Sequence, residues 1–379
     1  MIRGHGRSAG GRNRGGRAAL VLAGVVAAAT CPAQTIVDPG QGPVALPRGT
    51  TGAAELSGIT HLGGQRYLAV GDNGAKAIWT LDIAVDGTTG RITTASVSGS
   101  IAAPGLGSDS EGIAYRATTD SIFVADEVAS AIGQFDSTGA ALAPVAVPAI
   151  YAPANVRGNF GLEALAWGAG SLWTANEEAL SPDGPLSTTT AGTWVRIQRF
   201  SQSLTADGQW AYRTDPISAL SGLTTAERSG VVDVLPWNAT TLLVLEREFG
   251  GAIPGFRSRL YGVDLTTGSD VSAVGALATG SFTPLAKTLL WERSFSALAP
   301  SNFEGMSFGP DLADGRRSIL LISDDGGGTR QDLYALVAVP EPPALVLVVA
   351  ALAALPVARG LARRRRSVRY GRTGDGRGA

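Results

Sequence analysis

Carboxylates recur at one place in a phrase that the chain repeats five times, and their number and spacing suit chemistry with cations. In each copy one carboxylate precedes small or apolar residues, and a β-rich run then ends in further carboxylates. The leading carboxylates are Glu55, Glu111, Glu163, Asp233 and Glu304, and the run-ending ones are Asp72, Asp126, Glu127, Glu177, Glu246, Asp324 and Asp325. Converging carboxylates repel one another unless protons or hard cations intervene. Calcium takes six to eight oxygen ligands, so the pattern indicates a Ca²⁺ site.

Basic residues beside these phrases suit the binding of a phosphate or carboxylate group. A hydrolytic hypothesis follows, in which calcium neutralises an ester and activates a water. Its catalytic residues are Glu111, Glu163, Glu304, Arg247 and Lys287. Its metal ligands are Glu55, Asp72, Asp126, Glu127, Glu177, Glu246, Asp324 and Asp325. A second interpretation stays open, because a strand-ending acid also closes turns and a basic residue also pairs with a carboxylate.

The scarcity of histidine and cysteine excludes several other chemistries. His61 is the one histidine after the first 33 residues, and Cys31 is the single cysteine of the chain. Zinc sites built on histidine, Ser-His-Asp triads and disulfides are therefore ruled out for the main part of the protein.

The elements that must position the carboxylates are short strands separated by Gly, Asp, Asn and Thr-Gly turns. The leading carboxylates are 56, 52, 70 and 71 residues apart, and no segment with helical periodicity lies between Gln34 and Pro340. A four-stranded propeller blade takes roughly 40 to 50 residues. The sequence therefore predicts an all-β fold for residues 34–338, a β-propeller of about six blades, with five to seven compatible with the spacing.

Charge is distributed unevenly along the chain. Thirteen of the 31 basic residues lie in the first 33 or last 40 positions, but only two of the 32 acidic ones do. The middle of the chain therefore carries a formal net charge of about −12, which disfavours nucleic acid as a partner and favours metal cations.

Both ends of the chain have the layout of targeting segments. Arginines precede an apolar run from Ala18 to Ala29, as in a secretory signal peptide over residues 1–33. Near the other end, Val339-Pro340-Glu341-Pro342 is followed by an apolar run from Ala344 to Ala358 and by the cluster Arg363 to Arg366. A run of that length reaches the lower limit for a transmembrane helix, and the arginines hold its end in the cytoplasm. A basic tail, residues 367–379, follows.

The C-terminal order of VPEP, apolar helix and arginines resembles the PEP-CTERM sorting signal of Gram-negative bacteria, here over residues 339–366. The resemblance implies recognition by an exosortase, a transient anchor in the inner membrane, and delivery to the outer membrane, cell surface or medium. An ordinary single-pass anchor is the other interpretation of the same segment. Both interpretations place the working domain outside the cytoplasm.

The repeated phrases, in their order, resemble the phytase-like family, also called esterase-like activity of phytase. The similarity is greatest in three successive motifs near the C-terminus: KTLLWE, which begins at Lys287, NFEG, which contains Glu304, and a strand that ends in Ser-Asp-Asp at Asp325. The motif LVLERE, which contains Arg247, is a further match. The resemblance covers about Glu55 to Val337. It implies a propeller-like domain that hydrolyses a small phosphate ester or another ester. A secreted, non-catalytic module that binds an extracellular polymer remains the alternative.

Overall fold

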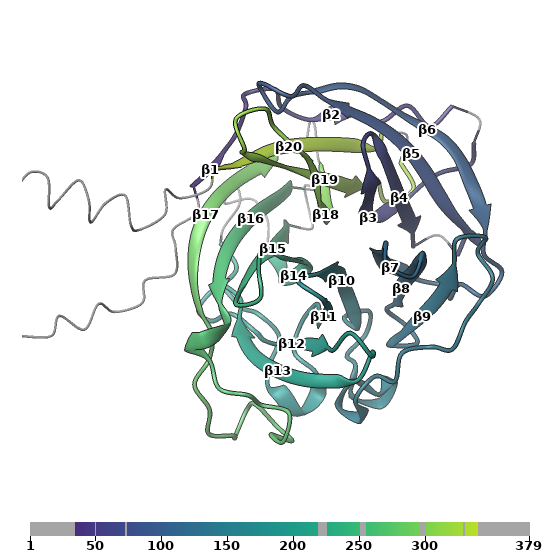
Figure 1. The fold of residues 1–379 in the computed structure, drawn as a ribbon. Helices are drawn as coiled ribbons and strands as arrows, with labels where there is room; N and C mark the ends of the chain where they lie inside the picture. The colour runs from purple at the N-terminus through teal and green to yellow at the C-terminus, as the bar shows by residue number, and fades with distance from the viewer. Residues whose placement is uncertain are drawn as a thin grey trace, which may run out of the picture. The chain divides into compact units, whose positions relative to one another are not determined.

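The computed structural model describes residues 35–339 apart from residues 50, 73, 219–225, 251–254, 296–300 and 329. Its strands form five antiparallel sheets that surround one axis as the blades of a propeller (Figure 1). The first strand of each blade lies nearest the axis, and the later strands follow outward.

The blades are numbered here in chain order. Blade 1 contains β3 (Leu56–Gly63), β4 (Arg66–Gly71), β5 (Ala77–Val85) and β6 (Ile92–Ala102). Blade 2 contains β7 (Ser110–Arg116), β8 (Ser121–Asp126) and β9 (Ala131–Asp136). Blade 3 contains β10 (Leu162–Gly168), β11 (Ser171–Asn176), β12 (Trp194–Phe200) and β13 (Ala206–Arg213). Blade 4 contains β14 (Ala226–Pro236), β15 (Thr241–Gly250), β16 (Gly255–Asp264) and β17 (Ala286–Phe295).

Blade 5 joins the two ends of the described chain. It contains β18 (Asn302–Asp311), β19 (Arg317–Asp324) and β20 (Asp332–Val339). The edge of β20 is completed by β1 (Thr35–Val37) and β2 (Val44–Ala45), which both pair with it in antiparallel fashion. Pairing an N-terminal strand with the last blade closes the ring and covers an edge that would otherwise be exposed.

The apolar core lies between neighbouring blades. One buried cluster combines Leu56, Tyr67 and Trp79 of blade 1 with Ile322 and Leu333 of blade 5. Each sheet is therefore covered on both faces, which is why β8 and most of β19 are buried along their length rather than at alternate residues.

Inner strands of adjacent blades approach each other through glycines. A Cβ atom on Gly58 would lie 2.3 Å from the carbonyl oxygen of Glu111 in the next blade. The equivalent distance is 2.7 Å from Gly112 to the carbonyl oxygen of Glu163, and 2.3 Å from Gly305 to that of Ser57. A side chain at these positions would collide with backbone, so these glycines allow the narrow spacing between inner strands.

The predicted all-β propeller is confirmed, and it has five blades rather than the expected six. The described residues of the two long repeat intervals form no additional sheet. They are occupied by longer strands and long connections, one between β11 and β12 and one between β16 and β17. In the described residues the helices are the short 3₁₀ turns η1 (Ala149–Tyr151), η2 (Pro153–Asn155), η3 (Ser181–Asp183) and η4 (Leu265–Thr267).

None of these described helices is long and apolar enough to cross a membrane. The predicted signal peptide and C-terminal helix lie outside the described residues, as does all of the sorting segment except Val339, which ends β20.

Candidate functional site

Three glutamates from three blades meet at the axis. Glu111 lies on β7, Glu163 on β10 and Glu304 on β18, and each is at most 7% exposed. One carboxylate oxygen of each lies within 4.8 Å of those of the other two. The structure thus brings together the three glutamates that the repeat predicted.

Two further groups of acids adjoin this one. Glu163 also belongs to a group with Glu127 and Glu177, and Glu111 belongs to a group with Asp72 and Asp109, each within the same 4.8 Å limit. The axial carboxylate cluster, as we call it, comprises Asp72, Asp109, Glu111, Glu127, Glu163, Glu177 and Glu304. Because Glu111 and Glu163 are shared, the three groups form one continuous set of oxygen donors.

A β-bulge places each of the three central glutamates. Leu162 pairs with Asn176 and Ala164 with Ala175, so Glu163 is an extra residue with no partner on β11. Shifts of register also occur at Glu304 and at Glu111. A bulge kinks the strand and redirects the extra side chain, here toward the axis.

Bulges at the corresponding places of β3 and β14 show which residues of the other two repeats are equivalent to the central glutamates. In β3 the shift falls between Leu56 and Gly58, which makes Ser57 the equivalent of the central glutamates, not Glu55. In β14 it falls between Val231 and Asp233, which makes Val232 the equivalent, not Asp233. The predicted ring of five acids therefore contains three, with Ser57 and Val232 at the remaining positions.

Asp233 instead cross-links the inner strands. Its carboxylate accepts a hydrogen bond of 2.6 Å from the backbone N–H of Met306 on β18 and one of 2.8 Å from that of Val234. The backbone of Leu165 on β10 also stabilises the charged carboxylate. Burial raises the pKa of Asp233, and these backbone donors oppose that shift.

Arg247 on β15 is the predicted basic residue that reaches the cluster. Its Nη2 atom donates to Oε1 of Glu304 at 2.7 Å and lies 3.2 Å from Oε1 of Glu177. Asn302 donates to the same oxygen of Glu304 at 2.8 Å. Glu304 is thus held in place, while the cluster keeps a large excess of acid groups over this single guanidinium.

Burial and mutual repulsion raise the pKa values of the acids in the cluster. Burial, followed by repulsion from neighbouring carboxylates, raises the pKa values of Glu111 and Glu163 well above the ordinary range. The same causes raise the pKa of Glu127 to about 8 and that of Asp72 to about 7. Burial raises the pKa of Glu304 to about 8 although Arg247 opposes it. A cluster of this kind shares protons or takes up cations.

The donor set fits a hard divalent cation. All ligand atoms of the three groups are carboxylate oxygens, which Ca²⁺ prefers. In addition, Oδ1 of Asp72 and Oδ1 of Asn302 are buried and accept no hydrogen bond from the part of the chain that the structure describes. Buried acceptors are normally satisfied, so these oxygens are available to a cation.

Other predicted ligands lie beside the cluster. Asp324 accepts a hydrogen bond from Asn302 at 3.4 Å and from the backbone of Gly326 at 2.9 Å. Asp325 pairs with Arg48 at 2.5 Å and accepts the backbone N–H of Glu55 at 3.0 Å. Glu55 has a φ of 51°, a left-handed conformation that is uncommon for a residue other than glycine and often occurs at functional sites.

The structure does not bring Lys287, Glu246 or Asp126 into the cluster. Lys287, on the outermost strand of blade 4, pairs with Glu246 at 2.6 Å and with Asp215 at 2.8 Å. Glu246 also accepts a hydrogen bond of 2.6 Å from Tyr212. Asp126 lies beside the cluster without joining its three groups: it accepts the N–H of Ala129 at 2.6 Å and that of Asp109 at 3.4 Å.

Two further basic residues lie in ion pairs of their own. Arg259 pairs with Glu248 at 2.8 Å, and Arg330 pairs with Asp332 at 2.7 Å.

Sequence reasoning missed Asp109 and Asn302. Each lies two residues before a leading glutamate, Glu111 and Glu304 respectively. That shared spacing in the sequence was the available signal.

Comparison with protein families gives a match over most of the chain. The family model described as Phytase-like, esterase-like activity of phytase, matches residues 51–327. None of the curated proteins matches the sequence.

Solved structures resemble the chain only distantly. An endo-arabinase from Bacteroides thetaiotaomicron is 11% identical with a TM-score of 0.42, and the match covers 79% of this chain and 98% of that one. A member of the duf4221 family from Bacteroides vulgatus is 8% identical with a TM-score of 0.39, and the match covers 82% of this chain and 98% of that one. Hydrazine synthase of Kuenenia stuttgartiensis is 12% identical with a TM-score of 0.34, covering 72% of this chain but only 57% of that one.

Proposed function

The chain belongs to the phytase-like family described as esterase-like activity of phytase, and we propose that it is a calcium-assisted hydrolase of phosphate or other esters. The observation that carries the proposal is the convergence of Glu111, Glu163 and Glu304 from three blades within 4.8 Å. Buried acids crowd together in this way at great electrostatic cost, and a cation offsets that cost.

The cation would be held by the axial carboxylate cluster, with Glu111 and Glu163 shared between its groups. A bound divalent ion supplies positive charge for an ester oxygen and lowers the pKa of a water ligand. Arg247 keeps Glu304 and Glu177 in place, and two further acids, Asp324 and Glu55, lie beside the cluster. Lys287 has no part in the proposal, because its ammonium group is already paired with two carboxylates.

The test compares esters and cations in one assay. Release of phosphate from p-nitrophenyl phosphate and from phytate, and of nitrophenol from p-nitrophenyl acetate, is measured with Ca²⁺ and with EDTA. We expect turnover that needs Ca²⁺ and that falls at least about 100-fold in Glu304→Gln, the loss typical of a removed catalytic electrostatic group. Asp311→Asn, at a carboxylate whose side chain is 70% exposed, serves as the matched control with unchanged turnover.

A non-catalytic secreted module is the competing function. The low exposure of the three central glutamates favours it, because deeply buried acids can hold a structural ion without contacting a substrate. Stoichiometric Ca²⁺ binding with turnover of all three esters at the buffer rate, together with retention on an extracellular polysaccharide column, would establish this function and reject the hydrolase.

We further propose that residues 1–33 direct export and that residues 339–366 are a sorting signal processed by an exosortase. This proposal rests on the order of VPEP, apolar run and arginines in the sequence. Fractionation of the producing cells with mass spectrometry of the mature C-terminus tests it. A product in the outer membrane or medium that ends near Val339 supports sorting, whereas a full-length product in the inner membrane supports a permanent anchor.

A further inference from the structure

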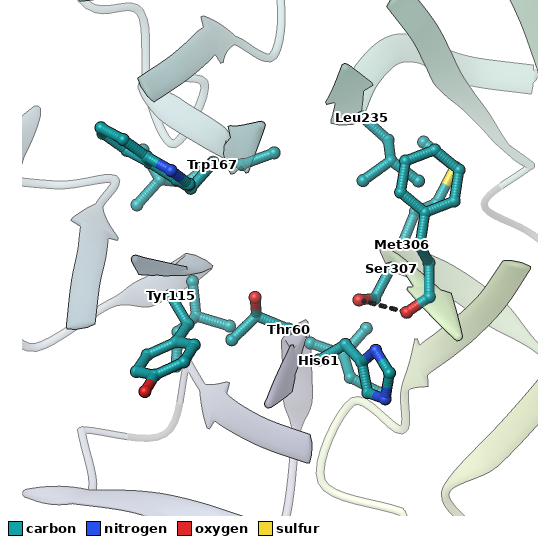
Figure 2. Close-up of a pocket in the computed structure, with 12 residues that line it drawn as sticks. Thr60, His61, Tyr115, Trp167, Leu235, Met306 and Ser307 are labelled. Atoms are coloured by element: carbon teal, nitrogen blue, oxygen red, sulfur yellow. Dashed lines mark hydrogen bonds between the residues drawn. The ribbon is translucent and has the colours of Figure 1, made fainter. Parts of the chain in front are cut away.

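The two ends of the channel differ in charge. A hollow lies farther along the inner strands than the axial carboxylate cluster, and Figure 2 shows it with Thr60, His61 and Ser307 among the residues that line it. None of the twelve residues drawn there is Asp, Glu, Lys or Arg. Burial lowers the pKa of His61, which favours the neutral imidazole. This hollow therefore offers an anionic ligand no charged partner, which leaves the carboxylate end of the channel for such a ligand.

Arg228 lies beside the carboxylate cluster and is exposed to solvent. It belongs to β14, two residues before Gly230, where a Cβ atom would lie 2.7 Å from Cγ of Glu177. The pairing of β14 with β15 is regular from Arg228 to Val231, so the side chain of Arg228 points to the same side of the strand as that Cβ atom. Arg228 therefore lies on the side of blade 4 that faces Glu177.

A second arginine on the same face is already engaged. Arg247 lies opposite Gly230 on β15, and residues opposite each other in an antiparallel pair share one face of the sheet. Its guanidinium binds Glu304 and Glu177. Arg228 forms no hydrogen bond or ion pair with the residues that the structure describes, and its contact is with an aromatic ring. The donors of Arg228 are therefore available to a ligand.

The charge of Arg228 acts on the buried acids nearby. Burial raises the pKa of Glu177, and the positive charges of Arg247 and Arg228 oppose this shift. Burial likewise raises the pKa of Glu178 to about 7, and Arg228 is among the groups that oppose it. Arg228 thus supplies positive charge at the edge of the cluster without being neutralised by a direct partner in the described part of the chain.

An aromatic ring tied to the cluster positions this guanidinium, which lies 4.4 Å from the centroid of the ring. The ring belongs to Phe160, which is buried. On one side of it, the side chain of Asn159 forms a hydrogen bond with Asp109. On the other side, the N–H of Gly161 donates to Oε1 of Glu127 at 3.2 Å. A guanidinium packed on such a ring loses less freedom when it binds a ligand.

An unpaired and positioned guanidinium suits the anionic group of an ester. Its N–H groups form a planar fork that matches two oxygens of a phosphate group. The carboxylates of the cluster repel an anionic ester, and positive charge at their edge offsets this repulsion. A neutral carboxylic ester carries no charge and gains less from a guanidinium.

We propose that Arg228 binds the phosphate group of the substrate and makes the site selective for phosphate esters over neutral esters. The inference rests on the proposed hydrolase function and narrows its substrate class.

Two substrates with the same leaving group test the assignment. The ratio of kcat/KM for p-nitrophenyl phosphate to kcat/KM for p-nitrophenyl acetate is measured in saturating Ca²⁺. We expect this ratio to fall at least about tenfold in Arg228→Met, through a higher KM for the phosphate ester, which corresponds to about 1.4 kcal/mol. Arg228→Lys keeps the charge without the planar fork, so its ratio should lie between those of the unmodified protein and of Arg228→Met.

A binding assay makes the test independent of turnover. Phenylphosphonate carries a similar anionic group on a P–C bond that is not hydrolysed. Its affinity in saturating Ca²⁺, measured by calorimetry, should fall at least about tenfold in Arg228→Met. Arg66→Met is the matched control, because Arg66 is also exposed and begins β4, at the opposite end of that strand from Asp72. This control should leave the affinity and the ratio unchanged.

The two proposals fail in different ways. Phenylphosphonate binding that depends on Arg228, without turnover of either ester, supports the anion site and rejects the hydrolase. Ca²⁺-dependent turnover of p-nitrophenyl phosphate with the same KM in Arg228→Met keeps the hydrolase and overturns the role of Arg228. An equal loss of affinity in Arg228→Met and Arg66→Met, or no phenylphosphonate binding to the unmodified protein at about 10 mM, also overturns that role.

Discussion

Gly112 of blade 2 lies against the backbone carbonyl of Glu163 of blade 3, so closely that a Cβ atom would come within 2.7 Å of that oxygen. Such contacts explain why glycine follows Ser57, Glu111 and Glu304 in blades 1, 2 and 5: backbone touches backbone between neighbouring inner strands. The same closeness brings the carboxylates of Glu111 and Glu163 into one site.

Gly112→Ala should therefore destabilise the protein by about 1 to 3 kcal/mol, the usual range for overpacking a tight core site. The added methyl group would meet three backbone or side-chain atoms at 2.7 Å. Urea denaturation of the purified variant measures the effect. Gly87→Ala, where a Cβ atom would have no neighbour within 4 Å, is the control and should change stability by less than about 0.5 kcal/mol.

Glu163→Gln should weaken Ca²⁺ binding more than Glu127→Gln does. Glu163 belongs to two of the carboxylate groups, whereas Glu127 belongs to one. We expect at least about a tenfold loss of affinity for Glu163→Gln by calorimetry, which corresponds to about 1.4 kcal/mol. Equal affinities of both variants and of the exposed control Asp311→Asn would show that the ion is bound elsewhere.

Lys287→Met should reduce stability without reducing Ca²⁺ affinity. Lys287 neutralises Glu246, which is fully buried and also accepts a hydrogen bond from Tyr212. Removal of one partner of a buried ion pair leaves an unpaired charge, which costs about 3 to 5 kcal/mol. The double variant Lys287→Met/Glu246→Gln should recover part of the loss in urea denaturation. A fall in Ca²⁺ affinity with unchanged stability would restore Lys287 to the functional site.

Without cations, the protein should lose stability as the pH rises from about 4.5 to 8. The folded-state pKa values of Glu127 and Glu304 are raised from 4.5 to about 8, and that of Asp72 from 3.8 to about 7. In this window the folded state binds more protons than the unfolded state, so the free energy of unfolding falls with increasing pH.

Urea denaturation in EDTA at pH 5, 6.5 and 8 measures this slope. Saturating Ca²⁺ should raise stability most at pH 8, since bound cations replace the protons. Glu127→Gln should flatten the slope in EDTA, and a slope of opposite sign in the unmodified protein would contradict the raised pKa values.

Much of the fold follows from local sequence. Alternating turn residues and apolar runs define the strands, and the five repeated phrases correspond to the five blades. The sequence also indicated Glu111, Glu163 and Glu304, because a glutamate followed by a small residue and an apolar one recurs at the same point of an inner strand. Composition alone excluded histidine and disulfide chemistry.

Tertiary structure decided which acids meet. Glu55 resembles the leading glutamates in the printed sequence, but it lies just before β3 with a φ of 51°, and the bulge in β3 puts Ser57 in their place. Glu246 ends one of the repeated phrases, yet it pairs with Lys287 inside blade 4, and Tyr212 of blade 3 donates a hydrogen bond to it. Register and blade packing depend on contacts between distant segments, and so the sequence pattern could identify the acids but not their partners.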